Sequence, residues 1–167
     1  MEGTKILCYV DREELYLPIE TLKAGMLVVT RGGYKKIDMI GSSTHVNPSA
    51  KDASIDTLYI CKKANYPELT EDLILTGTHS ILVNRLSEDQ KHLIKKIKQN
   101  IFITENKYRL IACIDPRAEP YPVQGAFTMW NMALENKDDL INYGIYANGL
   151  LVETASKRAM VSKQDGE

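Results

Sequence analysis

Short apolar runs separated by polar and turn-forming residues recur along most of the chain. The runs are rich in branched and aromatic residues, and several alternate with polar positions, as strands with one solvated face do. Many short strands at close spacing predict an all-β fold of mostly antiparallel strands. The predicted strands are residues 4–10, 15–19, 26–30, 34–41, 55–61, 73–75, 81–83, 101–103, 108–114, 127–134, 144–147 and 150–152.

Two segments carry strong local signals. Residues 87–100 predict a helix, since Ser87 and Gln90 fit a capping box at its start. The apolar positions of this helix form only a narrow stripe, at Leu93, Ile94 and Ile97. We therefore expect a surface helix inserted between strands. Near the end of the chain, Asn148-Gly149 between two apolar runs favours a type I′ hairpin turn.

Three stretches lack a periodic pattern. Residues 42–54 are polar and contain Pro48, which predicts a loop, and residues 115–125 hold three prolines, which predicts a long excursion. The chain after residue 155 is polar, as frayed tails are. Because no repeat or shift in composition marks a second domain, we predict one domain over residues 1–155 and a polar tail over 156–167.

Charge and hydropathy exclude several classes of protein. The 167 residues include 21 basic and 22 acidic side chains, giving a net charge of −1 and none of the basic excess typical of nucleic-acid binders. No apolar run approaches the roughly 20 residues that a membrane span needs. The first residues lack the basic-then-apolar pattern of a signal peptide. We expect a cytoplasmic monomer, in the host cytoplasm if the source is a virus.

The cysteines give no sign of a metal site or a disulfide framework. Cys8, Cys61 and Cys113 lie far apart, and no two form a C-x-x-C pair. Each sits in an apolar run, which indicates buried free thiols in a reducing compartment. We expect neither metal nor cofactor.

The candidate chemistry lies in residues 73–83. Two apolar runs enclose the polar residues 76–79, of which His79 has a side chain that can exchange protons near neutral pH. The alternative is a core histidine that is hydrogen-bonded to a threonine and has no other role. On this segment alone the alternative is favoured, because a single short motif is weak evidence for a function.

Four segments, in this order, resemble the Hint family, the module shared by hedgehog autoprocessing domains and inteins. Their sequences are E-G-T-K-I at residues 2–6, I-E-T-L-K-A-G-M-L-V at 19–28, T-G-T-H at 76–79, and Y-G-I-Y-A-N-G-L-L-V at 143–152. Each is weak alone, but together they span about residues 2–154. The overall pattern is most similar to Hint modules in proteins of large DNA viruses.

The resemblance implies a horseshoe-shaped all-β fold that acts once on its own N-terminal flanking segment. In the family, a cysteine thiol attacks the carbonyl just before it and converts an amide into a thioester. By this resemblance, His79 is the proton donor to the scissile nitrogen, and Thr76 hydrogen-bonds the same peptide. The functional interpretation of His79 becomes the favoured one, although it is inherited from the fold family.

This sequence departs from the family pattern at several positions. The nucleophilic cysteine is expected two residues before Met1, and Cys8, in the middle of a strand, is no substitute for it. Where inteins often have an aspartate after an aromatic residue, Asn131 follows Trp130, and an asparagine cannot take a proton from the thiol. Asp38 lies in the strand where hedgehog proteins keep a sterol-activating carboxylate, but a charge on the solvent face is the favoured explanation.

The end of the module also departs from the intein pattern. Glu153 and Thr154 replace the terminal His-Asn pair, so we expect no splicing. Two further classes of function stay open beside self-processing. One is an inert Hint fold that serves as a structural or interaction domain. The other is a small unrelated β-barrel that binds a ligand in an apolar pocket.

Overall fold

The computed structural model describes residues 1–52 and 54–164, and its strands pair antiparallel throughout this part of the chain. The all-β prediction is confirmed. The elements, in chain order, are β1 (Lys5–Val10), β2 (Glu13–Pro18), a 3₁₀ turn (Ile19–Thr21), β3 (Leu27–Thr30), β4 (Gly33–Asn47), a second 3₁₀ turn (Ala50–Asp52), β5 (Leu58–Cys61), β6 (Leu73–Thr76), β7 (Ser80–Val83), α1 (Glu88–Lys98), β8 (Ile103–Thr104), β9 (Lys107–Ile111), β10 (Ala118–Pro120), β11 (Gly125–Leu134), β12 (Gly144–Ala147), β13 (Leu150–Glu153) and α2 (Lys157–Gln164).

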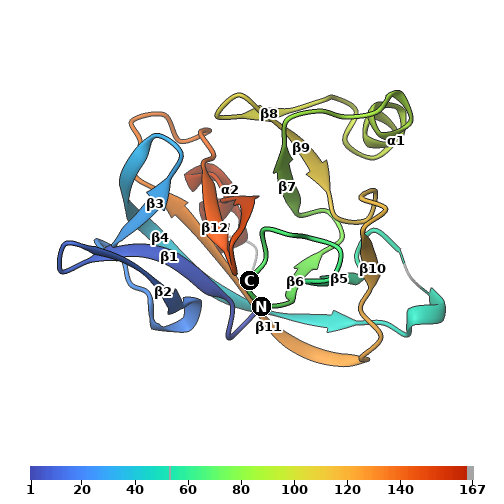
Figure 1. The fold of residues 1–167 in the computed structure, drawn as a ribbon, viewed down its shortest axis with the longest axis horizontal. Coiled ribbons are helices and arrows are strands. Elements are labelled where there is room, and N and C mark those ends of the chain that lie inside the picture. Colours follow the sequence, from blue (N-terminus) through green and yellow to red (C-terminus); the bar gives the residue numbers. More distant parts are fainter. Residues whose placement is uncertain (53, 165–167) are drawn as a thin grey trace.

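Two sheets organise these strands. The larger sheet runs in the order β11-β4-β3-β1-β12-β13-β7-β9-β8, with β2 paired to β1, and the smaller one in the order β10-β5-β6. Figure 1 shows the start of the chain beside β6 and β11, where the two sheets approach each other. Strands from the beginning, middle and end of the sequence therefore meet in one region.

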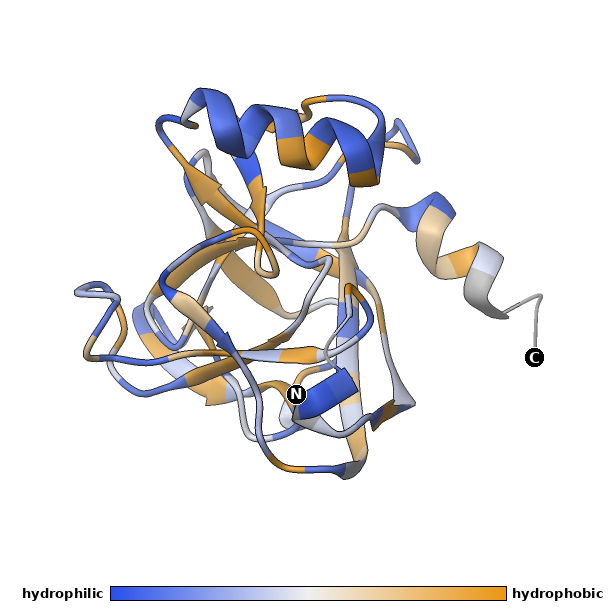
Figure 2. Ribbon diagram, turned by 90° about the vertical axis from the view of Figure 1, so that its right-hand side faces the viewer, coloured by the Kyte–Doolittle hydropathy of each residue, from blue (hydrophilic) through white to orange (hydrophobic). Residues whose placement is uncertain are grey.

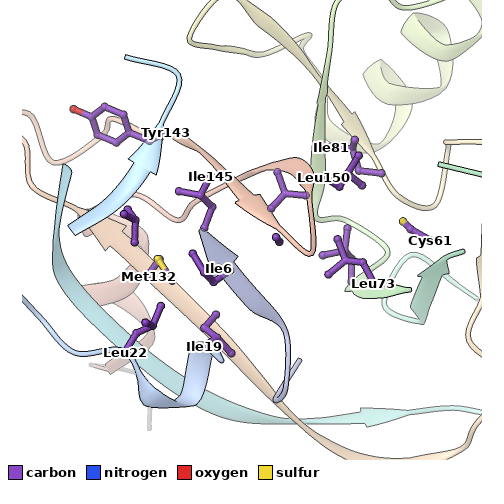
Figure 3. Packing of buried hydrophobic residues seen from close by; sticks show 14 of the residues in the cluster. Ile6, Ile19, Leu22, Cys61, Leu73, Ile81, Met132, Tyr143, Ile145 and Leu150 are labelled. Atoms are coloured by element: carbon purple, nitrogen blue, oxygen red, sulfur yellow. The ribbon is translucent and has the colours of Figure 1, made fainter. Parts of the chain in front are cut away.

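The main hydrophobic core fills the space between these strands. Ile6, Ile81, Ile145 and Leu150 come from four strands of the larger sheet, Leu73 comes from the smaller one, and all are buried. Figure 3 shows Leu73, Ile81 and Leu150 gathered at one end of the cluster. Burying one such side chain contributes about 1.5–3 kcal/mol. The core thus joins both sheets.

The two strong local signals are confirmed. Ser87 Oγ accepts a hydrogen bond from Gln90 N at 3.1 Å, and Gln90 Oε1 accepts one from Ser87 N at 2.9 Å, which completes the capping box. Helix α1 buries Ile94 and is mostly hydrophilic elsewhere (Figure 2). In the last hairpin the φ angles of Asn148 and Gly149 are 48° and 96°, as a type I′ turn requires.

The loop predicted over residues 42–54 is wrong for its first half. Strand β4 continues through polar residues to Asn47 and pairs with β11, with Thr44 opposite Thr128. The buried Asn47 amide fixes the end of the strand, because it accepts from Leu58 N and donates to Val123 O, both at 2.8 Å. A strand that is polar on both faces shows no alternation of polar and apolar residues. Only its pairing with another strand therefore identifies it as a strand.

The frayed tail predicted after residue 155 is also wrong for residues 157–164, which form α2, and its last residues, 165–167, lie outside the described part of the chain. Met160 of this helix is only 7% exposed. Lys157 Nζ lies 3.0 Å from Asp38 Oδ2 and 3.6 Å from Asp139 Oδ1, so the helix is tied to β4 and to the loop before β12. Neither α1 nor α2, the helices of the part described, has the length and apolar character that spanning a membrane requires.

Candidate functional site

Backbone hydrogen bonds fix the start of the chain. Glu2 N donates to Thr128 O of β11 at 2.9 Å, and Thr4 N donates back to Met1 O at 3.2 Å. Gly3 has a φ of 82°, which residues other than glycine rarely adopt. Its N–H donates to Glu20 Oε2 at 2.9 Å. The first residues therefore form a tight turn held against β11.

The connection between β6 and β7 carries the predicted proton donor. His79 N donates to Thr76 O at 3.0 Å, which closes the turn. Gly77 N donates to Thr57 O at 2.9 Å, and a Cβ on Gly77 would lie 2.5 Å from Ile55 O. A glycine is required there because the backbone of the preceding loop is so close. These contacts fix the backbone from Thr76 to His79.

A cavity of about 150 Å³, which we call the polar cavity, lies between the chain start, the β6–β7 turn and the β4–β11 pair. Its lining brings together three of the four predicted site residues: Thr76, His79 and Asn131. Met1 lines the same cavity, as do His45 and Trp130. The start of the chain and the T-x-x-H turn, about 75 residues apart in sequence, thus share one cavity.

A smaller cavity of about 50 Å³, which we call the apolar cavity, adjoins the same residues. Met1, His79 and Asn131 line it too, together with Glu153 and Thr154 at the end of the last hairpin. The first and last residues of the β fold therefore lie at one place. That arrangement is what chemistry on flanking peptide bonds requires.

The fourth predicted residue, Asp38, lies elsewhere. It is exposed on β4, pairs with Lys157, and lines neither the polar nor the apolar cavity. This placement agrees with the alternative of a solvent-face charge. Seven positions further along the same strand, His45 does line the polar cavity.

Two lining residues, His45 and Trp130, were missed as candidates. His45 Nε2 and Trp130 Nε1 are buried, and neither has a hydrogen-bond partner within residues 1–52 and 54–164. The signal in the sequence is a histidine and an indole on two segments that pair in the sheet. The loop predicted over residues 42–54 conceals that pairing.

Burial sets the electrostatics of this region. It lowers the pKa of the Met1 amino group to about 6, although Glu20 acts in the opposite direction. It raises the pKa of the Cys8 thiol to about 11, and that thiol donates to Ile6 O at 3.3 Å. A cysteine held protonated in this way is a poor nucleophile. No cluster of three or more His, Cys, Asp or Glu side chains able to hold a metal ion occurs in the described residues.

Glu153 lines the apolar cavity and forms an ion pair with Arg109 of β9. Its Oε1 lies 2.8 Å from Arg109 Nη1, and the carboxylate is largely buried. Burial raises the pKa of Glu153, and the attraction to Arg109 only partly offsets this effect. Thr154 Oγ1 accepts from Tyr143 N at 3.0 Å and donates to Ala155 O at 3.0 Å.

Comparisons with known proteins add one finding. No family model matches the chain, and no curated protein matches it. Among solved structures, the chain is similar to the gp41-1 intein, with 13% sequence identity and a TM-score of 0.43 over 90% of this chain and 93% of the intein chain. The function proposed below therefore rests on the cavities and the residues that line them.

Proposed function

We propose that the chain is a Hint-type self-processing module that activates a peptide bond before Met1 as a thioester. The observation that carries the proposal is the polar cavity, which Met1 shares with Thr76 and His79. A peptide segment before Met1 joins the chain at this cavity, where the turn that carries the proposed proton donor, His79, also lies.

The proposed reaction begins with a cysteine two residues before Met1. Its thiol loses its proton to water, the sulfur bonds to the preceding carbonyl carbon, the carbon–nitrogen bond breaks, and the departing nitrogen takes a proton from His79, which regains one from water. Thr76 hydrogen-bonds the same peptide and orients it. Met1 is only partly exposed, and a site shielded from water protects a thioester.

The test is a fusion in which a cysteine stands two residues before Met1 and a reporter protein precedes it. A strong thiol should release the reporter by thioester exchange. His79→Ala should slow the release by roughly 100-fold or more, the usual contribution of one positioned proton-transfer group. The matched control is His92→Ala, since His92 is exposed on α1, and no residue of α1 lines the polar or the apolar cavity. Equal release with and without His79 would exclude it from the mechanism.

A second candidate is a Hint-like fold without activity, serving as a structural or interaction domain. The presence of Asn131 where inteins often have an aspartate favours it, because an amide cannot take the proton of a thiol. A folded fusion that releases no reporter at any thiol concentration would support this candidate. The monomeric state, the cytoplasmic location and the similarity to modules of large DNA viruses stay predictions.

A further inference from the structure

The edge of β11 that faces away from β4 accepts a backbone hydrogen bond from each end of the β fold. Glu2 N donates to Thr128 O at 2.9 Å, and Ala155 N donates to Met132 O, also at 2.9 Å. In an antiparallel pair, every second residue points its N–H and C=O away from the partner strand. Thr128 and Met132 are such residues, and Trp130 lies midway between them with no shift in register. The N–H and C=O of Trp130 therefore point to the same edge, between the two bonds.

This stretch of edge is open for pairing. Within residues 1–52 and 54–164, no backbone group outside β4 bonds to Trp130. Backbone N–H and C=O groups are obligatory hydrogen-bonding groups, and an open strand edge is where another strand adds. The Trp130 side chain packs against the main hydrophobic core, which fixes the backbone beside it, and the residue lines both cavities. The edge thus offers one donor and one acceptor to an extended segment beside the cavities.

The direction of the chain start identifies that segment. Met1 lines both cavities, and so do Trp130 and Asn131. Glu2 is bonded further back along β11, at Thr128. Followed backwards from Glu2, the chain therefore runs toward the C-terminal end of β11 and antiparallel to it, beside the strand in Figure 1. Two residues further along, the residue directly before Met1 falls opposite Trp130, and the one before that falls opposite Asn131.

We propose that the segment before Met1 adds to β11 as a short antiparallel strand, in which the residue directly before Met1 exchanges two backbone hydrogen bonds with Trp130. This inference rests on the proposed self-processing function and specifies how its substrate is held. The pairing puts the cysteine opposite Asn131. Because Ala155 already occupies the edge at Met132, the added strand ends there. The chain leaves the edge at the peptide bond before the cysteine, which is the bond that the thiol attacks.

Main-chain recognition determines which flanking segments the edge accepts. Hydrogen bonds from a strand edge do not depend on side chains, so most residues should be accepted directly before Met1. Proline is the exception, because it has no N–H to donate to Trp130 O. In the reporter fusion, alanine at this position should allow release, and proline should slow it by roughly 10-fold, the effect of one lost hydrogen bond. Equal release from the alanine and proline fusions would contradict the proposed pairing.

Amide hydrogen exchange tests the pairing without the chemistry. The chain is extended before Met1 by the flanking peptide of the fusion, with alanine in place of the cysteine, so that no thioester can form. The Trp130 amide should exchange at least roughly 10-fold more slowly than in the chain that begins at Met1. Proline directly before Met1 should reduce this protection. The matched control is the amide of Asn131, which points to β4 and should exchange equally in both chains.

The two measurements separate this inference from the proposed function. If the fusion releases no reporter but the Trp130 amide is protected, self-processing fails and the strand addition stands. Release of the reporter without protection of the Trp130 amide would overturn the strand addition and leave self-processing in place. Protection in the chain that begins at Met1, rising with protein concentration, would show a second copy at this edge and would also overturn the inference.

Discussion

Asn148 joins three parts of the chain through one side chain. Its Oδ1 accepts from Lys5 N at 2.7 Å, and its Nδ2 donates to Asp72 O at 2.9 Å. The residue is 4% exposed and has a φ of 48°, which asparagine tolerates better than most residues. The turn residue that shapes the last hairpin therefore also fixes the position of β1, which begins just after the anchored chain start.

We expect Asn148→Ala to lower the free energy of unfolding by about 2–4 kcal/mol, because two partly buried backbone hydrogen bonds are lost and alanine disfavours positive φ. Chemical denaturation measures the change. Asn106→Ala is the matched control: Asn106 has a φ of 63° in the β8–β9 turn but is exposed, so only about 1 kcal/mol should be lost. A similar cost for both variants would show that the hydrogen bonds of Asn148 contribute little.

Glu153 provides a test of pH dependence. Burial raises its pKa in the folded protein above the ordinary value of 4.5. The stability that its protonated form contributes is fully present below the unfolded-state pKa and is lost as pH rises through the folded-state pKa. Glu153→Gln keeps the shape and removes this titration. We expect wild type and variant to be equally stable near about pH 4, and the variant to be the more stable at about pH 8.

Urea denaturation across this pH range measures the difference in unfolding free energy between the two proteins. Asp38→Asn is a suitable control, since Asp38 is an exposed carboxylate paired with a lysine. If wild type gains stability over Glu153→Gln as pH rises, the ion pair with Arg109 outweighs the cost of burying the carboxylate.

Among the elements, α1 packs through a satellite cluster and stands apart from the main core. Ile94 contacts Leu86, Leu110 and Ile111, none of which belongs to the main cluster. The rest of the helix is hydrophilic, and none of its residues lines the polar or the apolar cavity. The helix therefore stabilises the outer strands and takes no part in the proposed chemistry.

The neighbours Ile94 and Leu93 allow a paired test of this packing. Ile94 is 1% exposed and Leu93 is 44% exposed. We expect Ile94→Ala to cost about 2–4 kcal/mol of unfolding free energy, and Leu93→Ala about 0.5 kcal/mol or less. Neither should change the rate of reporter release. Equal costs would mean that the helix does not pack as described, and a slower release in Ile94→Ala would connect α1 to the site.

At the scale of the whole molecule, the site exists only because distant segments meet. Met1, the β6–β7 turn, the middle of β11 and the end of β13 all border the apolar cavity. The last hairpin pairs with both β1 and β7, so it lies between the chain start and the strand that follows His79. A change that separates these strands removes the site without touching its side chains.

This arrangement also predicts that no cleavage or splicing occurs at the C-terminal end. Splicing requires an asparagine whose side-chain nitrogen closes a five-membered imide. Glu153 has no nitrogen, and the Thr154 hydroxyl is held by hydrogen bonds to Tyr143 N and Ala155 O. Asn148 has an amide, but its two hydrogen bonds and its place in a tight turn hold it away from cyclisation.

The reporter fusion, extended after Glu167 with a second reporter, tests this prediction by intact mass measurement. Only release of the first reporter is expected. A ligated product of the two reporters, or release of the second one at Thr154, would contradict the prediction and place the chain among splicing proteins.

The sequence by itself determined the elements whose signals are local. The capping box at Ser87, the Asn148-Gly149 turn and most strands follow from residues a few positions apart, and those residues impose the same geometry in any context. His79 is a candidate in the same way, from a polar turn between two apolar runs. The resemblance to the Hint family adds Thr76 and Asn131, and the structure brings all three to the polar cavity.

Only the tertiary structure decided the rest. The polar half of β4 is a strand because β11 pairs with it, and α2 forms where Met160 and Lys157 find partners on other elements. For the same reason Asp38 lies on the surface while His45 lines the polar cavity, although both belong to one strand. Which way a side chain faces depends on what packs against its strand, and that information lies far away along the chain.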